Sequence, residues 1–135
     1  MAGYSGTPLL KKIGIKDGDR IFLVSDPGNF LDLLGELPSQ CTVIAKGDAE
    51  VNVGVLFSTS AGDLKKRFGA SAKRLAQNGM LWVAWPKKAS GVATDLDENV
   101  VRGIGLAEGL VDTKVCAIDE TWSGLRFVIR RKDRK

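Results

Sequence analysis

The chain has 135 residues, of which 44% are hydrophobic and 27% are charged, the usual balance of a globular domain with one hydrophobic core. No apolar run approaches the roughly 20 residues that span a bilayer, and residues 1–12 lack the apolar segment of a secretory signal. The absence of histidine excludes Ser-His-Asp triads and His-ligated zinc, and the net charge of +4 is too mild to indicate a nucleic-acid protein. We expect one cytoplasmic domain, residues 1–135, with no membrane segment and no metal site.

The N-terminal part, residues 1–19, is predicted to form a surface strap followed by a short helix. Thr7 and Pro8 are typical of a helix start, and Gly14 is typical of a helix end, which predicts a helix over residues 9–13. Apolar runs bounded by turn residues then predict strands and one short helix. The strands are residues 20–25, 41–45 and 51–57, and the helix is residues 30–34.

The middle of the chain contains a helix and a long apolar strand. Ser60, with Asp63 three residues later, resembles a capping box and predicts a helix over residues 61–77. The run at residues 80–86 has no polar alternation, which is typical of a strand buried on both faces. Trp82 and Trp85 have an odd spacing within this strand, so we expect them on opposite faces of the sheet.

The C-terminal part predicts one more helix and two strands. Asp95 and Glu98 resemble a second capping box, which predicts a helix over residues 96–108. Two β-rich runs, residues 110–118 and 124–130, are joined by a segment short enough for an antiparallel hairpin. The basic tail, residues 131–135, is expected to be solvated, and nucleic-acid binding by it is a minor alternative.

The order of these elements predicts an α/β fold. We expect a single Rossmann-like (methyltransferase-like) doubly wound sheet over residues 20–130, mostly parallel with an antiparallel C-terminal strand. In such sheets the carboxyl ends of the parallel strands share one edge, and ligands bind there. The candidate ligand-binding residues in the loops at this edge are Asp26, Gly28, Asn29, Thr59, Ser60, Lys87, Lys88, Ser90, Asp119, Glu120 and Trp122.

Each of these loops also has a structural interpretation. Lys87 and Lys88 can clamp an anion or can form a solvated turn. Residues 26–29 can present backbone amides to a ligand or can form only a tight turn. Asp119 and Glu120 can bind a ligand hydroxyl or amine, can form salt bridges with Lys87 or Lys88, or can solvate the hairpin. Trp122 can stack on a planar ligand or cap the core.

Known motifs do not assign a cofactor or a catalytic residue. The chain lacks a G-x-G-x-x-G segment after its first strand, a phosphate-binding G-x-x-x-x-G-K-[ST] loop and a G-x-S-x-G nucleophile turn. Gly103 and Gly105 lie inside a helical pattern, so no dinucleotide-binding role is given to them. Both the cofactor and the catalytic residues are left unassigned.

Two resemblances add to this interpretation. From Arg20 onward, the order of elements is similar to that of a shortened class I S-adenosylmethionine-dependent methyltransferase, and the Asn-Gly-Met-Leu segment at residues 78–81 approximates the start of that family's fifth strand. The family's Gly-rich cofactor loop is replaced here by residues 26–29. The whole chain also resembles a family of small bacterial proteins of unknown function, through residues 3–9, 85–91 and 119–125. That second resemblance implies no activity.

Three hypotheses about function are compatible with the sequence. The favoured one is a non-enzymatic domain that binds a small anionic ligand or a nucleotide at the carboxyl edge of its sheet. The second is a divergent S-adenosylmethionine-dependent methyltransferase, in which Asp26 and Asp119 lie near the cofactor or act as acid–base groups. The third is a protein-interaction module that uses residues 1–7 or the basic tail.

Overall fold

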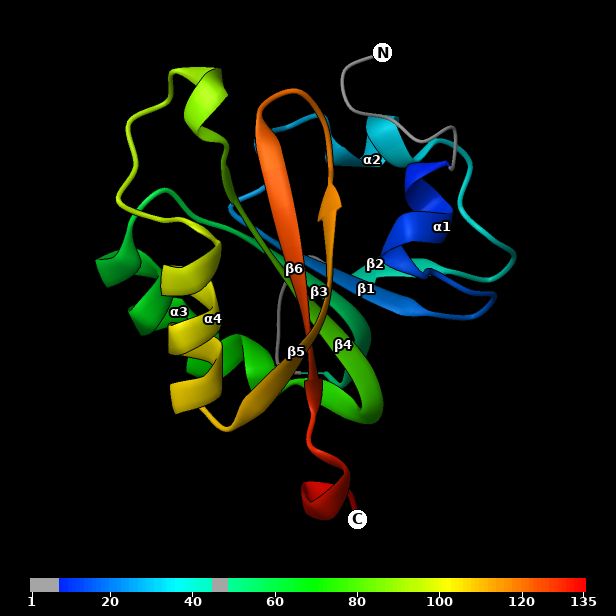
Figure 1. Cartoon of the computed structure of the whole chain (residues 1–135). Helices are drawn as coiled ribbons and strands as arrows, with labels where there is room; N and C mark the ends of the chain where they lie inside the picture. Colours follow the sequence, from blue (N-terminus) through cyan, green and yellow to red (C-terminus); the bar gives the residue numbers. More distant parts are fainter. Residues whose placement is uncertain (1–7, 45–48) are drawn as a thin grey trace.

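The centre of the computed structural model, which describes residues 8–44 and 49–135, is a six-stranded sheet with the order β2-β1-β3-β4-β6-β5 (Figure 1). The pairings from β2 through β4 are parallel, and β6 is antiparallel to both β4 and β5. This arrangement confirms the predicted Rossmann-like sheet with an antiparallel C-terminal strand. The strands are β1 (Arg20–Val24), β2 (Thr42–Ile44), β3 (Val51–Phe57), β4 (Leu75–Pro86), β5 (Leu110–Ala117) and β6 (Trp122–Ile129).

Helices cover both faces of this sheet. In Figure 1, α1 (Leu9–Ile13) and α2 (Phe30–Leu34) lie on one side, and α3 (Ala61–Ala72) and α4 (Glu98–Ala107) lie on the other. Two short 3-10 turns, η1 (Lys88–Ser90) and η2 (Arg131–Asp133), follow β4 and β6. The helix α1 ends at Gly14 in the left-handed conformation, as predicted. The predicted cap Thr7 lies outside the described residues.

Each face of the sheet has its own hydrophobic core, and β4 contributes to both. Trp82 is fully buried with Phe30 and Phe57 under α1 and α2, whereas Trp85 is buried with Phe68 under α3 and α4. The prediction that the two tryptophans face opposite sides is therefore confirmed. Since α3 and α4 bury apolar side chains on one face only, their basic residues stay at the surface.

The predicted end of α3 is wrong. The helix stops at Ala72, and Leu75, which was expected to lie in its last turn, begins β4 by pairing with Val51 of β3. The register then shifts between Val51 and Val53, so β4 bulges before its regular pairing begins. A Cβ at Gly79 would lie 3.0 to 3.2 Å from backbone atoms of Ala76 and Asn52, so this bulge needs glycine. Helical spacing of apolar residues gave no sign of this strand pairing.

The predicted cap of α4 is also wrong. Asp97 precedes the helix, and its Oδ1 accepts a hydrogen bond of 2.8 Å from the backbone N–H of Val100. The side chain of Asp95 instead accepts a hydrogen bond of 2.8 Å from the N–H of Ala61, at the start of α3. The final strand begins at Trp122, earlier than predicted, because Trp122 pairs with Pro86 of β4.

Candidate functional site

The loops that carry the predicted ligand-binding residues all follow strands that run in the same direction. The strands β1, β3 and β4 are parallel, and β5 runs the same way because both β4 and β5 are antiparallel to β6. The loops after β1, β3 and β4 and the turn after β5 therefore all lie at the carboxyl edge of the sheet (Figure 1). At this edge, the point between β1 and β3 is a topological switch, because the chain leaves β1 toward β2 on one side and leaves β3 toward β4 on the other.

Arg67 of α3 spans this switch point. Its Nη1 donates a hydrogen bond of 2.9 Å to Oγ of Ser25, the residue after β1. Its Nε forms an ion pair of 2.8 Å with Oδ1 of Asp63, one helical turn earlier. The side chain of Arg67 is 46% exposed. Ser25 has a φ of 56°, a left-handed conformation that is uncommon for serine and is typical of functional loops.

The loop after β3 is held by polar contacts next to Arg67. The buried Ser58 donates a hydrogen bond of 2.9 Å from Oγ to Oδ2 of Asp63. Ser60 caps α3, since its Oγ accepts a hydrogen bond of 3.1 Å from the N–H of Asp63, in agreement with the predicted helix start. The side chain of Thr59 is exposed, and its carbonyl accepts a hydrogen bond from Thr94. A network of serine, aspartate and arginine thus connects two neighbouring strand ends.

The loop after β1 is a turn that bonds to itself. Oδ1 of Asp26 accepts a hydrogen bond of 3.0 Å from the N–H of Gly28, whose φ of 110° requires glycine. Asn29 precedes α2 and is exposed, and its side chain makes no capping hydrogen bond. This loop therefore offers an exposed amide side chain at the carboxyl edge, while Oδ1 of Asp26 is already engaged.

Lys87 connects the end of β4 to the turn between β5 and β6. Its Nζ donates a hydrogen bond of 2.7 Å to the carbonyl of Asp119, and its backbone N–H donates one of 2.8 Å to the carbonyl of Thr121. Ser90 folds back on the same loop, with its Oγ donating to the carbonyl of Lys87 over 2.6 Å. Lys88 is exposed. Of the two predicted clamp lysines, one holds the edge together and the other faces solvent.

The turn after β5 is built by Asp119 and closed by Trp122. Oδ1 of Asp119 accepts hydrogen bonds of 2.8 Å from the N–H groups of both Thr121 and Trp122. The Trp122 ring packs edge-on against Phe57, with 5.1 Å between ring centroids, and Phe57 packs in the same way on Phe30. Trp122 thus caps the core at this edge, whereas the neighbouring Glu120 is exposed.

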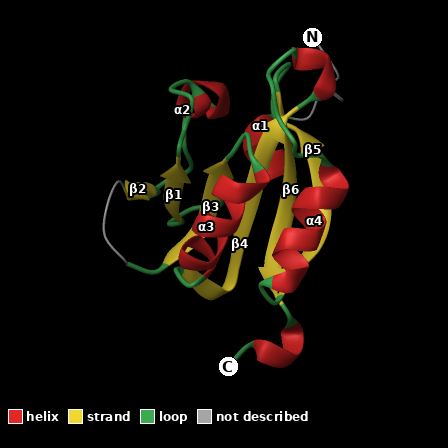
Figure 2. Cartoon of the chain, turned by 90° about the vertical axis from the view of Figure 1, so that its left-hand side faces the viewer, coloured by secondary structure: helices red, strands yellow, loops and turns green. Residues whose placement is uncertain are grey.

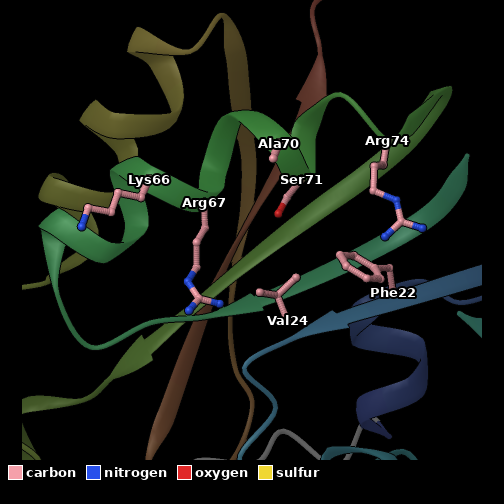
Figure 3. A pocket seen from close by; sticks show the side chains of 7 residues that line it. All are labelled: Phe22, Val24, Lys66, Arg67, Ala70, Ser71 and Arg74. Atoms are coloured by element: carbon pink, nitrogen blue, oxygen red, sulfur yellow. The ribbon is translucent and has the colours of Figure 1, made fainter. Parts of the chain in front are cut away.

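A groove of about 320 Å³ runs beside α3 along the face of β1 (Figure 3). Its lining residues are Phe22, Val24, Lys66, Arg67, Ala70, Ser71 and Arg74. None of these lining residues was among the candidates predicted from the sequence. The Asp63–Arg67 spacing of one helical turn was the available sign of an ordered arginine. Within residues 8–44 and 49–135, no cluster of His, Cys, Asp or Glu suits a metal ion.

No family model and no curated protein matches the chain, but many solved structures do. One is magnesium protoporphyrin IX methyltransferase from Synechocystis PCC 6803 with bound SAH, with a TM-score of 0.59 and 11% identity over 90% of this chain and 78% of that chain. A SAM-dependent methyltransferase from Aquifex aeolicus matches with a TM-score of 0.61 and 14% identity, over 90% of this chain and 88% of that one. A TehB-like SAM-dependent methyltransferase from Corynebacterium glutamicum ATCC 13032 matches with a TM-score of 0.58 and 9% identity, over 96% of this chain and 91% of that chain.

These similarities show the fold and, at such low identity, only the fold. The chain has the fold of class I SAM-dependent methyltransferases, which agrees with the more distant of the two resemblances noted in the sequence. No helix in the part of the chain that the structure describes has the length and apolarity to cross a membrane.

Proposed function

We propose that the protein is a non-enzymatic binding domain for a small anionic ligand, such as a nucleotide or a phosphorylated metabolite, at the carboxyl edge of its sheet. The observation that carries this proposal is the position of Arg67 at the switch point between β1 and β3, the place where open α/β sheets bind ligands. A guanidinium group has more N–H donors than its bonds to Ser25 and Asp63 use. With the side chain 46% exposed, donors of Arg67 remain accessible to an anion.

The residues around Arg67 fit a ligand with both charge and polar groups. The exposed Asn29 and Thr59 stand on the loops that Arg67 connects, and they supply donors and acceptors for hydroxyl or base groups. Lys88 follows β4, the next strand in the sheet, and adds an exposed positive charge at the same edge. In this proposal Lys87 and Asp119 shape the edge through their mutual hydrogen bond, and Trp122 supports it from the core.

A divergent methyltransferase is the second candidate function. It is favoured by the fold, since the similar magnesium protoporphyrin IX methyltransferase structures contain bound SAM or SAH. In this chain the methyl donor would lie at the same edge, beside residues 26–29 and Arg67. Asp26 and Asp119 are less suited to acid–base work, because Oδ1 of each already accepts hydrogen bonds from its own turn.

The test is a calorimetric and thermal-shift titration of the protein with ATP, inorganic phosphate, SAM and SAH. A ligand at about a hundred times its dissociation constant adds roughly 2.7 kcal/mol to the free energy of unfolding. We expect Arg67→Ala to weaken binding at least tenfold, which corresponds to about 1.4 kcal/mol. Lys65→Ala is the matched control, because Lys65 is an exposed cation on the same helix and does not line the groove.

The outcomes separate the two candidates. Binding of ATP or phosphate that depends on Arg67 supports the anion site. Binding of SAM and SAH alone favours the methyltransferase and would require a search for the methyl acceptor. Anion binding that is equally strong in Arg67→Ala, or absent in the wild type, contradicts the proposed site.

A further inference from the structure

The groove beside α3 is a second place where this chain can hold a ligand. Phe22 and Val24 of β1 form its apolar floor. The helix α3 forms one wall, to which Ala70 contributes (Figure 3). The residues that line it include cations and no acidic side chain. Its volume of about 320 Å³ falls within the range of small-molecule pockets.

The groove is open because helices cover only part of this face of the sheet. Figure 2 shows α3 and α4 in front of β3, β4 and β6, with β1 and β2 beyond the edge of α3. Leu64 and Phe68 of α3 are fully buried in the core over β3 and β4. Phe22 and Val24 are only partly buried, since no helix among the described residues packs over them. Apolar side chains are therefore accessible next to basic ones.

Arg74 places a buried, unused donor at one end of the groove. This arginine is only 8% exposed. Its Nε and Nη2 donate hydrogen bonds of 3.1 and 3.0 Å to the carbonyl of Ala49, and its guanidinium lies 3.8 Å from the ring centroid of Phe22. The remaining nitrogen, Nη1, is buried and has no hydrogen-bond partner among residues 8–44 and 49–135. A buried donor on a charged group that lacks a partner is costly, and an anionic partner would remove that cost.

Ser71 adds a second unused donor beside it. This residue is 6% exposed, and its side chain makes no hydrogen bond to any residue of the described chain. Figure 3 shows its hydroxyl directed from α3 into the groove, toward the side where Val24 lies. Arg74 lies in the turn after α3, where its N–H bonds to the carbonyl of Ser71. Both residues line the same groove.

We propose that this groove binds a small amphiphilic carboxylate, an organic acid with a planar apolar body. The carboxylate lies at the Ser71 and Arg74 end, where it accepts hydrogen bonds from Oγ of Ser71 and from Nη1 of Arg74. The apolar body lies on Phe22 and Val24 against Ala70. This site is separate from the one proposed at the carboxyl edge, and Arg67, which borders both, is left unchanged in its test.

The test is an NMR titration of amide chemical shifts with 2-naphthoate as the probe. Two further probes separate the contribution of the negative charge from that of the apolar ring. 2-Naphthylmethanol has the same ring system without the charge, and inorganic phosphate has the charge without the ring. We expect 2-naphthoate to shift the amides of Phe22, Val24, Ala70 and Ser71, and to bind at least tenfold more tightly than the alcohol. Phosphate is expected to leave these amides unchanged.

A pair of variants tests the location of the probe. Ala70→Trp fills the groove from an exposed helix position and is expected to abolish 2-naphthoate binding. Lys65→Trp places the same bulky ring elsewhere on α3, outside the groove, and is expected to retain it. The proposal is overturned if Ala70→Trp binds like the wild type, if the alcohol binds as tightly as the acid, or if 2-naphthoate at low millimolar concentration fails to shift the groove amides. If phosphate changes the amide chemical shifts of Ser25 or Thr59, the change reports binding at the carboxyl edge and not in the groove.

Discussion

The indole Nε1 of Trp82 donates a hydrogen bond of 2.9 Å to the backbone carbonyl of Ile13, and both residues are completely buried. This bond joins the middle of the sheet to the last residue of α1. A short helix of this kind has little stability of its own, so its position depends on such tertiary contacts.

Replacement of Trp82 by Phe tests this connection. The variant removes the donor, leaves the carbonyl of Ile13 buried without a partner and opens a small cavity. We expect the free energy of unfolding to fall by about 2 to 4 kcal/mol, measured by urea denaturation. Trp85→Phe is the control on the opposite face, because its indole makes no hydrogen bond to a described residue; an equal loss in both variants would contradict the role of the hydrogen bond.

Replacement of Gly105 by alanine is predicted to destabilise the protein. A Cβ built at this position of α4 would overlap the ring of Phe127 on β6. Although alanine has the higher helix propensity, we expect Gly105→Ala to lower the free energy of unfolding by about 1 to 3 kcal/mol through overpacking. Gly103→Ala, in the same helix with nothing near the added Cβ, should instead be neutral or stabilising by up to about 1 kcal/mol. Thermal denaturation of the pair gives the comparison, and a stable Gly105→Ala would show that α4 can move away from the sheet.

Asp119 is expected to matter for stability more than its neighbour Glu120. Asp119→Ala leaves the N–H groups of Thr121 and Trp122 without their acceptor and loosens the turn that Lys87 contacts. A loss of about 1 to 2 kcal/mol in the free energy of unfolding is the expected result. Glu120→Ala removes an exposed carboxylate and should change stability by less than about 0.5 kcal/mol. Equal effects of the two substitutions would mean that Asp119 acts only through its charge.

Burial raises the pKa of the Cys116 thiol, and the nearby cations Lys12 and Lys114 only partly oppose this shift. In the Cys41→Ser background, we therefore expect iodoacetamide to alkylate Cys116 at pH 8 more slowly than it alkylates glutathione. The raised pKa also means that the folded protein keeps this proton over a pH range in which the unfolded chain loses it. The contribution of Cys116 to the free energy of unfolding is therefore fully present below the ordinary pKa of a thiol, and it is lost as the pH rises through the raised pKa. An alkylation rate equal to that of glutathione would contradict this assignment.

The sequence predicted those elements whose signals are local. Pro8 and Gly14 marked α1, and largely apolar runs marked β1, β3 and the part of β4 from Met80 onward. The odd spacing of Trp82 and Trp85 placed them correctly on opposite faces, because side chains alternate along a strand. With the parallel order of the strands, these signals also brought the predicted loops to one edge of the sheet.

The misplaced boundaries came from contacts between distant segments. Leu75 left the helical pattern because the edge of β3 at Val51 offered it a strand partner. Asp95 appeared to cap the helix next to it, but its carboxylate satisfies the N–H of Ala61, 34 positions earlier in the chain. A carboxylate near two helix starts can cap either one, and only their relative placement selects between them.

The candidate sites show the same contrast between local signals and contacts of distant segments. Residue types and turn signals alone were sufficient to place polar loops at the carboxyl edge, since strand direction follows from the order of elements. The roles of Arg67 and Arg74 needed the tertiary structure. Arg67 bonds to Ser25, 42 positions away, and Arg74 bonds to Ala49, 25 positions away. Hydrogen bonds of a long, flexible side chain depend on which acceptors the fold brings within reach, and periodicity along the sequence carries no record of them.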